Sequence, residues 1–173
     1  MIPHAKRVAV GVSTFLLVGC DVFSDGASRD LSALQDEVKI AVPAAAIKWE
    51  IFGTPEHKGW GVPGPTDYIT LVAEIEAPDG STMARLKENA GNQWIAPESA
   101  RTWLSPHFQA LLKNARADTI ALTQCKKYQV VVTKSGRLVD GFACQHEGLL
   151  LIHVKLLGPS ERYIDKAEPP VFE

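Results

Sequence analysis

Residues 124–145 read QCKKYQVVVTKSGRLVDGFACQ, and this stretch decides the fold. Two runs rich in strand-forming residues flank the loop 133–136, whose glycine is placed for a left-handed backbone. We therefore predict a β-hairpin made of strands 124–132 and 137–145.

The register of this hairpin brings its two cysteines together. If Val132 pairs with Arg137, the two residue numbers of every pair in the hairpin add up to the same total. The numbers of Cys125 and Cys144 also add up to that total, so this register places the two cysteines opposite each other. Directly opposed residues in an antiparallel pair are close enough for a disulfide. Both faces of the hairpin are chemically mixed, so the hydrophobic pattern permits this register without fixing it. The register also opposes Val130 to Val139 and Tyr128 to Gly141.

Three more segments, 46–52, 68–77 and 149–157, alternate apolar and polar residues as strands do. In 68–77 the apolar positions share one face, which is typical of an antiparallel sheet with its other face in water. In 149–157 the alternation puts His153 opposite the core face, so we expect a partly exposed, non-catalytic histidine. Together with the hairpin these segments give about five strands.

Short helices complete the predicted fold. Asp30 or Ser32 can cap a helix within 30–40, and Ser105 followed by proline is a strong start for another helix. The fold class is therefore α+β: a mostly antiparallel sheet of about five strands with one or more short helices packed on one face. Weaker helical signals cover 81–87 and 97–104.

The amino-terminal segment has the features of an export signal. A short basic stretch containing Lys6 and Arg7 precedes the apolar run 8–18. A helix of that length reaches about 16 Å, roughly half of a bilayer core, which is too short for an ordinary spanning helix. The run ends in Leu17-Val18-Gly19-Cys20, LVGC.

This ending resembles a bacterial lipobox. The resemblance implies cleavage after Gly19, thioether lipidation of Cys20 with diacylglycerol, and acylation of the new amino terminus. Several acyl chains would give stable membrane anchoring. Asp21 resembles the inner-membrane retention signal of enteric bacteria, so the resemblance favours the inner membrane and a domain facing the periplasm. The alternative is a core helix with a buried cysteine.

The chain then divides into a signal peptide, 1–19, a lipidated cysteine with its tether, 20–30, and one globular periplasmic domain, 31–173, with a proline-containing acidic tail. Cleavage leaves 154 of the 173 residues and, with two cations lost, changes the net charge from −2 to −4. A mildly acidic domain gives no reason to expect nucleic-acid binding. With Cys20 lipidated, Cys125 and Cys144 form an even pair in an oxidising compartment, where a disulfide is expected.

A loop rich in proline and glycine, 53–66, carries the candidate partner-binding residues His57, Lys58 and Trp60. Its prolines disfavour a continuous helix or an interior strand. A tryptophan exposed on a fixed loop makes a good binding anchor, although Trp60 can equally fold back over the core. The loop also contains G-x-G-x-x-G, but no strand–helix context accompanies that pattern, so its glycines are interpreted as turn formers.

Catalytic signals are sparse. The sequence has no G-x-S-x-G, H-E-x-x-H or paired C-x-x-C motif. A zinc set can be drawn from the two cysteines with His146 and His153, but its spacing fits no usual finger. No metal or other cofactor is therefore expected.

Three functions remain open. The first is a non-catalytic module at the membrane that binds an envelope or periplasmic protein. A more specific version is a periplasmic immunity protein against a secreted toxin. The third is an envelope enzyme with an unrecognised site, for example His57 with Glu56 or Asp67.

Overall fold

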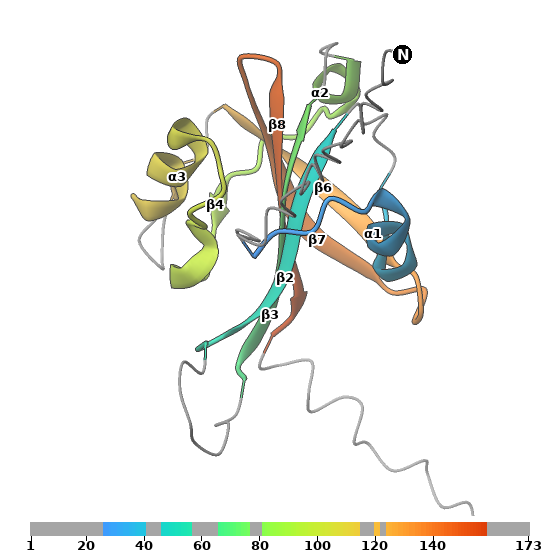
Figure 1. Cartoon of the computed structure of the whole chain (residues 1–173). Coiled ribbons are helices and arrows are strands. Elements are labelled where there is room, and N and C mark those ends of the chain that lie inside the picture. Colours follow the sequence, from blue (N-terminus) through green and yellow to red (C-terminus); the bar gives the residue numbers. More distant parts are fainter. Residues whose placement is uncertain are drawn as a thin grey trace, which may run out of the picture.

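The computed structural model describes residues 26–40, 46–56, 66–76, 81–114, 120–121 and 124–158. Its centre is a six-stranded antiparallel sheet in the order β1-β6-β7-β8-β3-β2 (Figure 1). A small second sheet pairs β4 with β5. The strands are β1 (Val38–Lys39), β2 (Ile47–Thr54), β3 (Tyr68–Glu76), β4 (Asn92–Gln93), β5 (Ile120–Ala121), β6 (Cys125–Val132), β7 (Leu138–His146) and β8 (Leu149–Leu157).

The predicted α+β class is confirmed, with six strands in the main sheet instead of about five. The extra strand is β1, whose residues the sequence assigned to the end of a helix. Val38 and Lys39 instead pair with Val132 and Val131 at the edge of the sheet.

The predicted hairpin register is confirmed. Cys125 lies opposite Cys144, with their Cα atoms 4.3 Å apart, and the two side chains form a disulfide. The N–H of Val132 donates to the carbonyl of Arg137 at 2.8 Å, which closes the turn as expected. Gly136 has a φ of 69°, the left-handed conformation that glycine adopts without steric cost.

The helices are short and lie where the sequence places them. They are α1 (Leu31–Glu37), α2 (Ser81–Arg85), the 3-10 helix η1 (Pro97–Ser99) and α3 (Pro106–Lys113). Asp30 caps α1, because its carboxylate accepts a hydrogen bond from the N–H of Ala33 at 3.1 Å. Ser105 occupies the cap position of α3, but its side chain makes no capping bond.

Both faces of the sheet are covered, so the expectation of helices on one face and water on the other is wrong. On one face Leu34 of α1 packs in a core with Leu71 and Val130. On the other face Phe108 of α3 packs in a second core with Phe142. Figure 1 shows α1 and α3 on opposite sides of the sheet. The amphipathic pattern misled here because several polar residues of the second face contact polar partners instead of water.

Part of the stretch that the sequence assigned to the tether belongs to the fold. Ser28 and Trp49 exchange two backbone hydrogen bonds, of 2.8 and 2.9 Å, which add Ser28 to the outer edge of β2. The indole N–H of Trp49 also donates to the carbonyl of Asp30 at 2.9 Å. Among the described residues, no helix is long and apolar enough to cross a bilayer.

Candidate functional site

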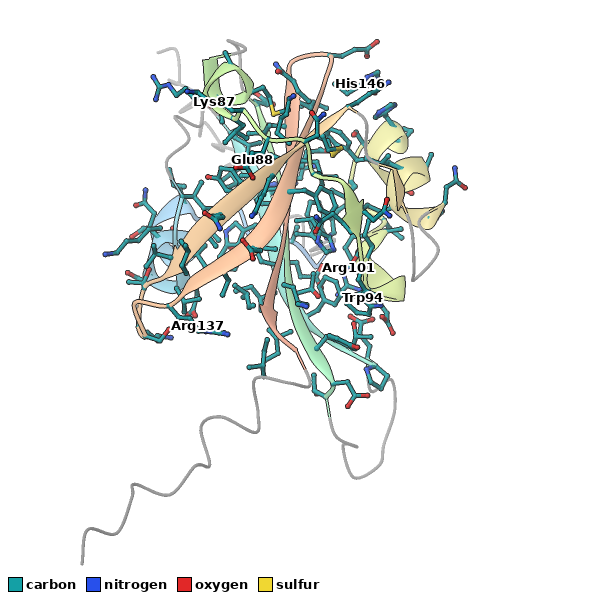
Figure 2. All side chains as sticks on the ribbon, turned by 180° about the vertical axis from the view of Figure 1, so that it is seen from behind. Lys87, Glu88, Trp94, Arg101, Arg137 and His146 are labelled. Carbon is teal, nitrogen blue, oxygen red and sulfur yellow. A yellow bond between two sulfur atoms is a disulfide. The ribbon has the colours of Figure 1, made fainter. Side chains whose placement is uncertain are left out.

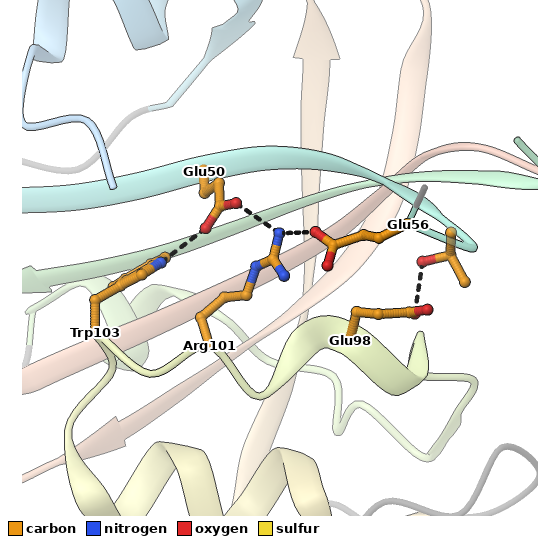
Figure 3. Close-up of polar contacts among 6 residues, drawn as sticks. Glu50, Glu56, Glu98, Arg101 and Trp103 are labelled. Atoms are coloured by element: carbon orange, nitrogen blue, oxygen red, sulfur yellow. Dashed lines mark hydrogen bonds and ion pairs between the residues drawn. The ribbon is translucent and has the colours of Figure 1, made fainter. Parts of the chain in front are cut away.

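A hollow of about 350 Å³ opens where the 94–105 segment meets the end of β2. It contains three carboxylates and one guanidinium (Figure 3). Glu56 lies within the predicted partner loop 53–66 and directly precedes the candidate residue His57, so the hollow lies at the base of that loop. Its lining residues are Gly26, Glu50, Glu56, Glu98, Ala100, Arg101, Thr102 and Trp103.

Arg101 is the centre of the hollow. Its Nη2 donates to Oε1 of Glu50 at 2.5 Å and also to Oε1 of Glu56. The guanidinium carbon lies 3.9 Å from the centre of the Phe52 ring, within the range of a cation–π contact. Burial disfavours the charged guanidinium, but the two carboxylates outweigh this effect and keep the pKa of Arg101 raised. Arg101 thus ties β2 to the start of the partner loop.

The other polar groups of the hollow also form hydrogen bonds within the protein. The indole N–H of Trp103 donates to the second oxygen of Glu50 at 2.8 Å. The hydroxyl of Thr54 donates to Glu98 at 3.0 Å. Each of the three carboxylates therefore accepts at least one hydrogen bond from another side chain of the protein.

A buried hydrogen bond fixes the segment between Glu98 and Arg101. The Oγ of Ser99 lies 3.0 Å from Nε2 of His153, and the imidazole stacks on Phe142 with ring centres 4.8 Å apart. His153 is only 2% exposed, so the expectation of a partly exposed histidine is wrong. Burial lowers the pKa of His153 to about 4, which keeps the ring neutral at ordinary pH. This sealed Ser–His pair positions the segment and has no access to a substrate.

The four residues of the possible zinc site do not come together in the structure. Cys125 and Cys144 are oxidised, His153 is sealed in the core, and His146 stacks on His107 with ring centres 3.5 Å apart. In the described part of the chain, no three histidine, cysteine or carboxylate groups gather to hold a metal ion.

The remaining predicted site residues are described only in part. Cys20, His57, Lys58 and Trp60 lie outside the described residues. Of the groups suggested for an enzyme, Glu56 is paired with Arg101, and the backbone N–H of Asp67 donates to the carbonyl of Thr54 at 2.8 Å. These contacts fix both ends of the loop base.

Sequence reasoning missed Glu50, Arg101 and Trp103. One weak signal was present: Glu50 on β2, and Glu74 and His153 on neighbouring strands, are polar residues inside otherwise strong strand patterns. Their partners come from a segment about 30 to 50 residues away in the sequence. No family model matches this chain, and neither a curated protein nor a solved structure shows a significant match to it.

Proposed function

We propose that the chain is a membrane-anchored periplasmic lipoprotein that acts as a non-catalytic protein-binding module, using loop 57–65 and the hollow at its base. The observation that carries this proposal is the double contact of Arg101 with Glu50 and Glu56. It ties the base of the loop to the sheet before any partner arrives. Because the side chains of the hollow are already held in place, they lose less conformational entropy on association.

The state of the polar groups supports binding over catalysis. A catalytic base or nucleophile must be open to its substrate. In the hollow, the carboxylates of Glu50, Glu56 and Glu98 already accept hydrogen bonds from protein donors. Ser99, the last residue of the 3-10 helix, and its partner His153 are both buried. Polar groups with these partners can give a binding surface its shape, but they are not open to act on a substrate.

The lipobox-like sequence and the position of Gly26 together support a partner close to the membrane. Only residues 21–25 separate Cys20 from Gly26, the first described residue. Even a fully extended chain would span at most about 20 Å over that distance. Since Gly26 also lines the hollow, lipidated Cys20 would keep the hollow near the bilayer.

Capture of a partner tests the binding function. The full-length protein would be extracted in a neutral detergent and used to capture proteins from the envelope of the bacterium that carries it. We expect a specific partner to be retained by the wild type and lost on Trp60→Ala. Lys113→Ala, on the exposed surface of α3, is the matched control and should retain the partner.

Four results would change this proposal. Equal capture by the wild type and Trp60→Ala would remove the loop from the interface, and failure to capture any specific protein would overturn binding altogether. A secreted toxin in the captured fraction would identify the immunity function. Chemical conversion of the captured molecule, abolished by Glu56→Gln, would favour the enzyme.

A separate fractionation tests the anchor. Cys20→Ser should prevent lipidation and shift the protein out of the fraction of lipid-modified membrane proteins. Lipid labelling that persists in this variant would show that Cys20 is not the modified residue.

A further inference from the structure

A second hollow, which we call the basic groove, lies along β6. Its volume is about 370 Å³, and it lies between residues 85–88, which start at the last residue of α2, and residues 127–129 of β6. β6 and β2 lie at opposite ends of the sheet order, apart from the short strand β1. In Figure 2, Lys87 and Glu88 accordingly lie far from Arg101. The lining residues are Arg85, Leu86, Lys87, Glu88, Lys127, Tyr128 and Gln129.

The groove reverses the charge of the rest of the protein. The whole chain has a net charge of −2, yet the groove has three cations and one carboxylate. That carboxylate, Glu88, is 75% exposed and lies 3.9 Å from Lys127, a loose contact in water. Arg85 and Lys87 are exposed and form no ion pair with any described residue. The groove therefore has uncompensated positive charge.

The shape of the groove fits an extended chain. Two segments cover the outer edge of β6: residues 88–90, which hydrogen-bond to Cys125 and Lys127, and β1, which pairs at Val131. The groove lies between these covers. The nearly buried ring of Tyr128 and the half-buried Leu86 add apolar surface beside the cations. Charged and apolar surface side by side suit an extended segment, whose successive side chains point in alternating directions.

We propose that the basic groove binds an acidic, extended segment of a partner protein. The glutamate or aspartate side chains of that segment would pair with Arg85, Lys87 and Lys127 where the segment crosses the groove. A flat anionic bilayer could touch the exposed Arg85 and Lys87 but not the recessed Tyr128. None of the residues that line this groove belongs to the loop 53–66, so the inference does not depend on the proposed function.

The test is direct binding of a defined peptide. A fluorescein-labelled peptide of alternating glutamate and serine, about eight residues long to match a typical strand, is titrated with the full-length protein in neutral detergent at low salt. We expect saturable binding that weakens as salt screens the charges. The same peptide with lysine in place of glutamate should not bind.

Variants locate the binding. Arg85→Glu combined with Lys87→Glu should weaken the peptide about tenfold or more, because two attractions become repulsions. Lys113→Glu combined with Lys155→Glu makes the same change in net charge on exposed residues elsewhere and should leave the affinity within about twofold. Trp60→Ala should bind the peptide normally, which separates this surface from the loop. Thermal melts would verify that each variant is folded, and the neutral pair Arg85→Gln with Lys87→Gln replaces any variant that is not.

Three results would overturn the proposal. The first is a wild type that binds no acidic peptide even at low salt, and the second is equal weakening of peptide binding by both charge-reversal pairs. The third is binding of phosphatidylglycerol vesicles that depends on Arg85 and Lys87, together with peptide binding that does not depend on them. The groove would then be a lipid contact.

Discussion

The imidazole of His153 and the hydroxyl of Ser99 meet in the core at 3.0 Å, and their hydrogen bond joins the central sheet to the segment that carries Glu98 and Arg101. Both side chains are almost fully buried. The geometry of the hollow therefore depends on a histidine that must stay uncharged.

Acid should weaken the fold through His153. Its pKa is about 4 in the folded protein and 6.5 as an ordinary histidine, so the unfolded chain binds more protons between these values. The stability that depends on neutral His153 is fully present above about pH 6.5. As the pH decreases to 4, the free energy of unfolding falls by about 3 kcal/mol. Urea denaturation at a series of pH values measures this loss.

His153→Phe should flatten that pH dependence. The ring can still stack on Phe142, while the unpaired hydroxyl of Ser99 lowers stability at every pH. His146→Gln, a change on a partly exposed histidine, should keep the wild-type profile. Parallel profiles for the wild type and His153→Phe would assign the acid sensitivity to other groups.

Reduction of the disulfide should destabilise the protein by about 3 kcal/mol, the expected effect of a crosslink between residues 19 apart in sequence. The midpoint of urea unfolding, measured with and without reductant, reports the change. Before reduction, a thiol reagent should label neither Cys125 nor Cys144 in the unfolded protein. Two reactive thiols at that stage would contradict the bond.

Gly141→Ala should cost about 3 kcal/mol of stability or prevent folding. A Cβ at this position would lie 2.2 Å from the carbonyl oxygen of His153 and 2.9 Å from Cα of Val154, and backbone cannot yield as a flexible side chain does. Gly136→Ala is the control: its φ is positive but its surroundings are open, so about 1 kcal/mol is expected. Equal stability of the two variants would contradict the packing of β7 against β8.

Arg101→Gln should lower the free energy of unfolding by about 2 kcal/mol, because Glu50 and Glu56 would lose their shared cation in a partly buried site. Adding Glu56→Gln should recover part of the loss by removing one of the two like charges. Strictly additive effects in this double-mutant cycle, followed by urea denaturation, would show that the two residues are not coupled.

The elements that sequence reasoning recovered are those with local signals. The turn glycine and the two cysteines indicated the hairpin register, and a serine followed by proline marked the start of α3. All five predicted strands are present, with boundaries shifted by up to about two residues, which is the usual scatter of strand ends.

The second covered face could not be predicted, because alternation of apolar and polar residues does not distinguish a polar side chain in water from one with a buried partner. Glu74, for example, accepts a hydrogen bond from the backbone N–H of Ser105 at 2.8 Å. His153 likewise meets Ser99. The short strand β1 was missed for a related reason, since its two residues continue the helical spacing of α1 and only their pairing with β6 makes them a strand.

The pairing of Ser28 with Trp49 also has a mechanical consequence. If Cys20 is fixed in a bilayer, any tension between the membrane and a bound partner enters the domain through the two hydrogen bonds of this pair. Because Trp49 is followed directly by Glu50, strand β2 and the hollow would be the first parts of the domain to carry that load. Pulling the protein by its amino terminus should therefore detach residues 26–30 first, and the disulfide-linked hairpin last.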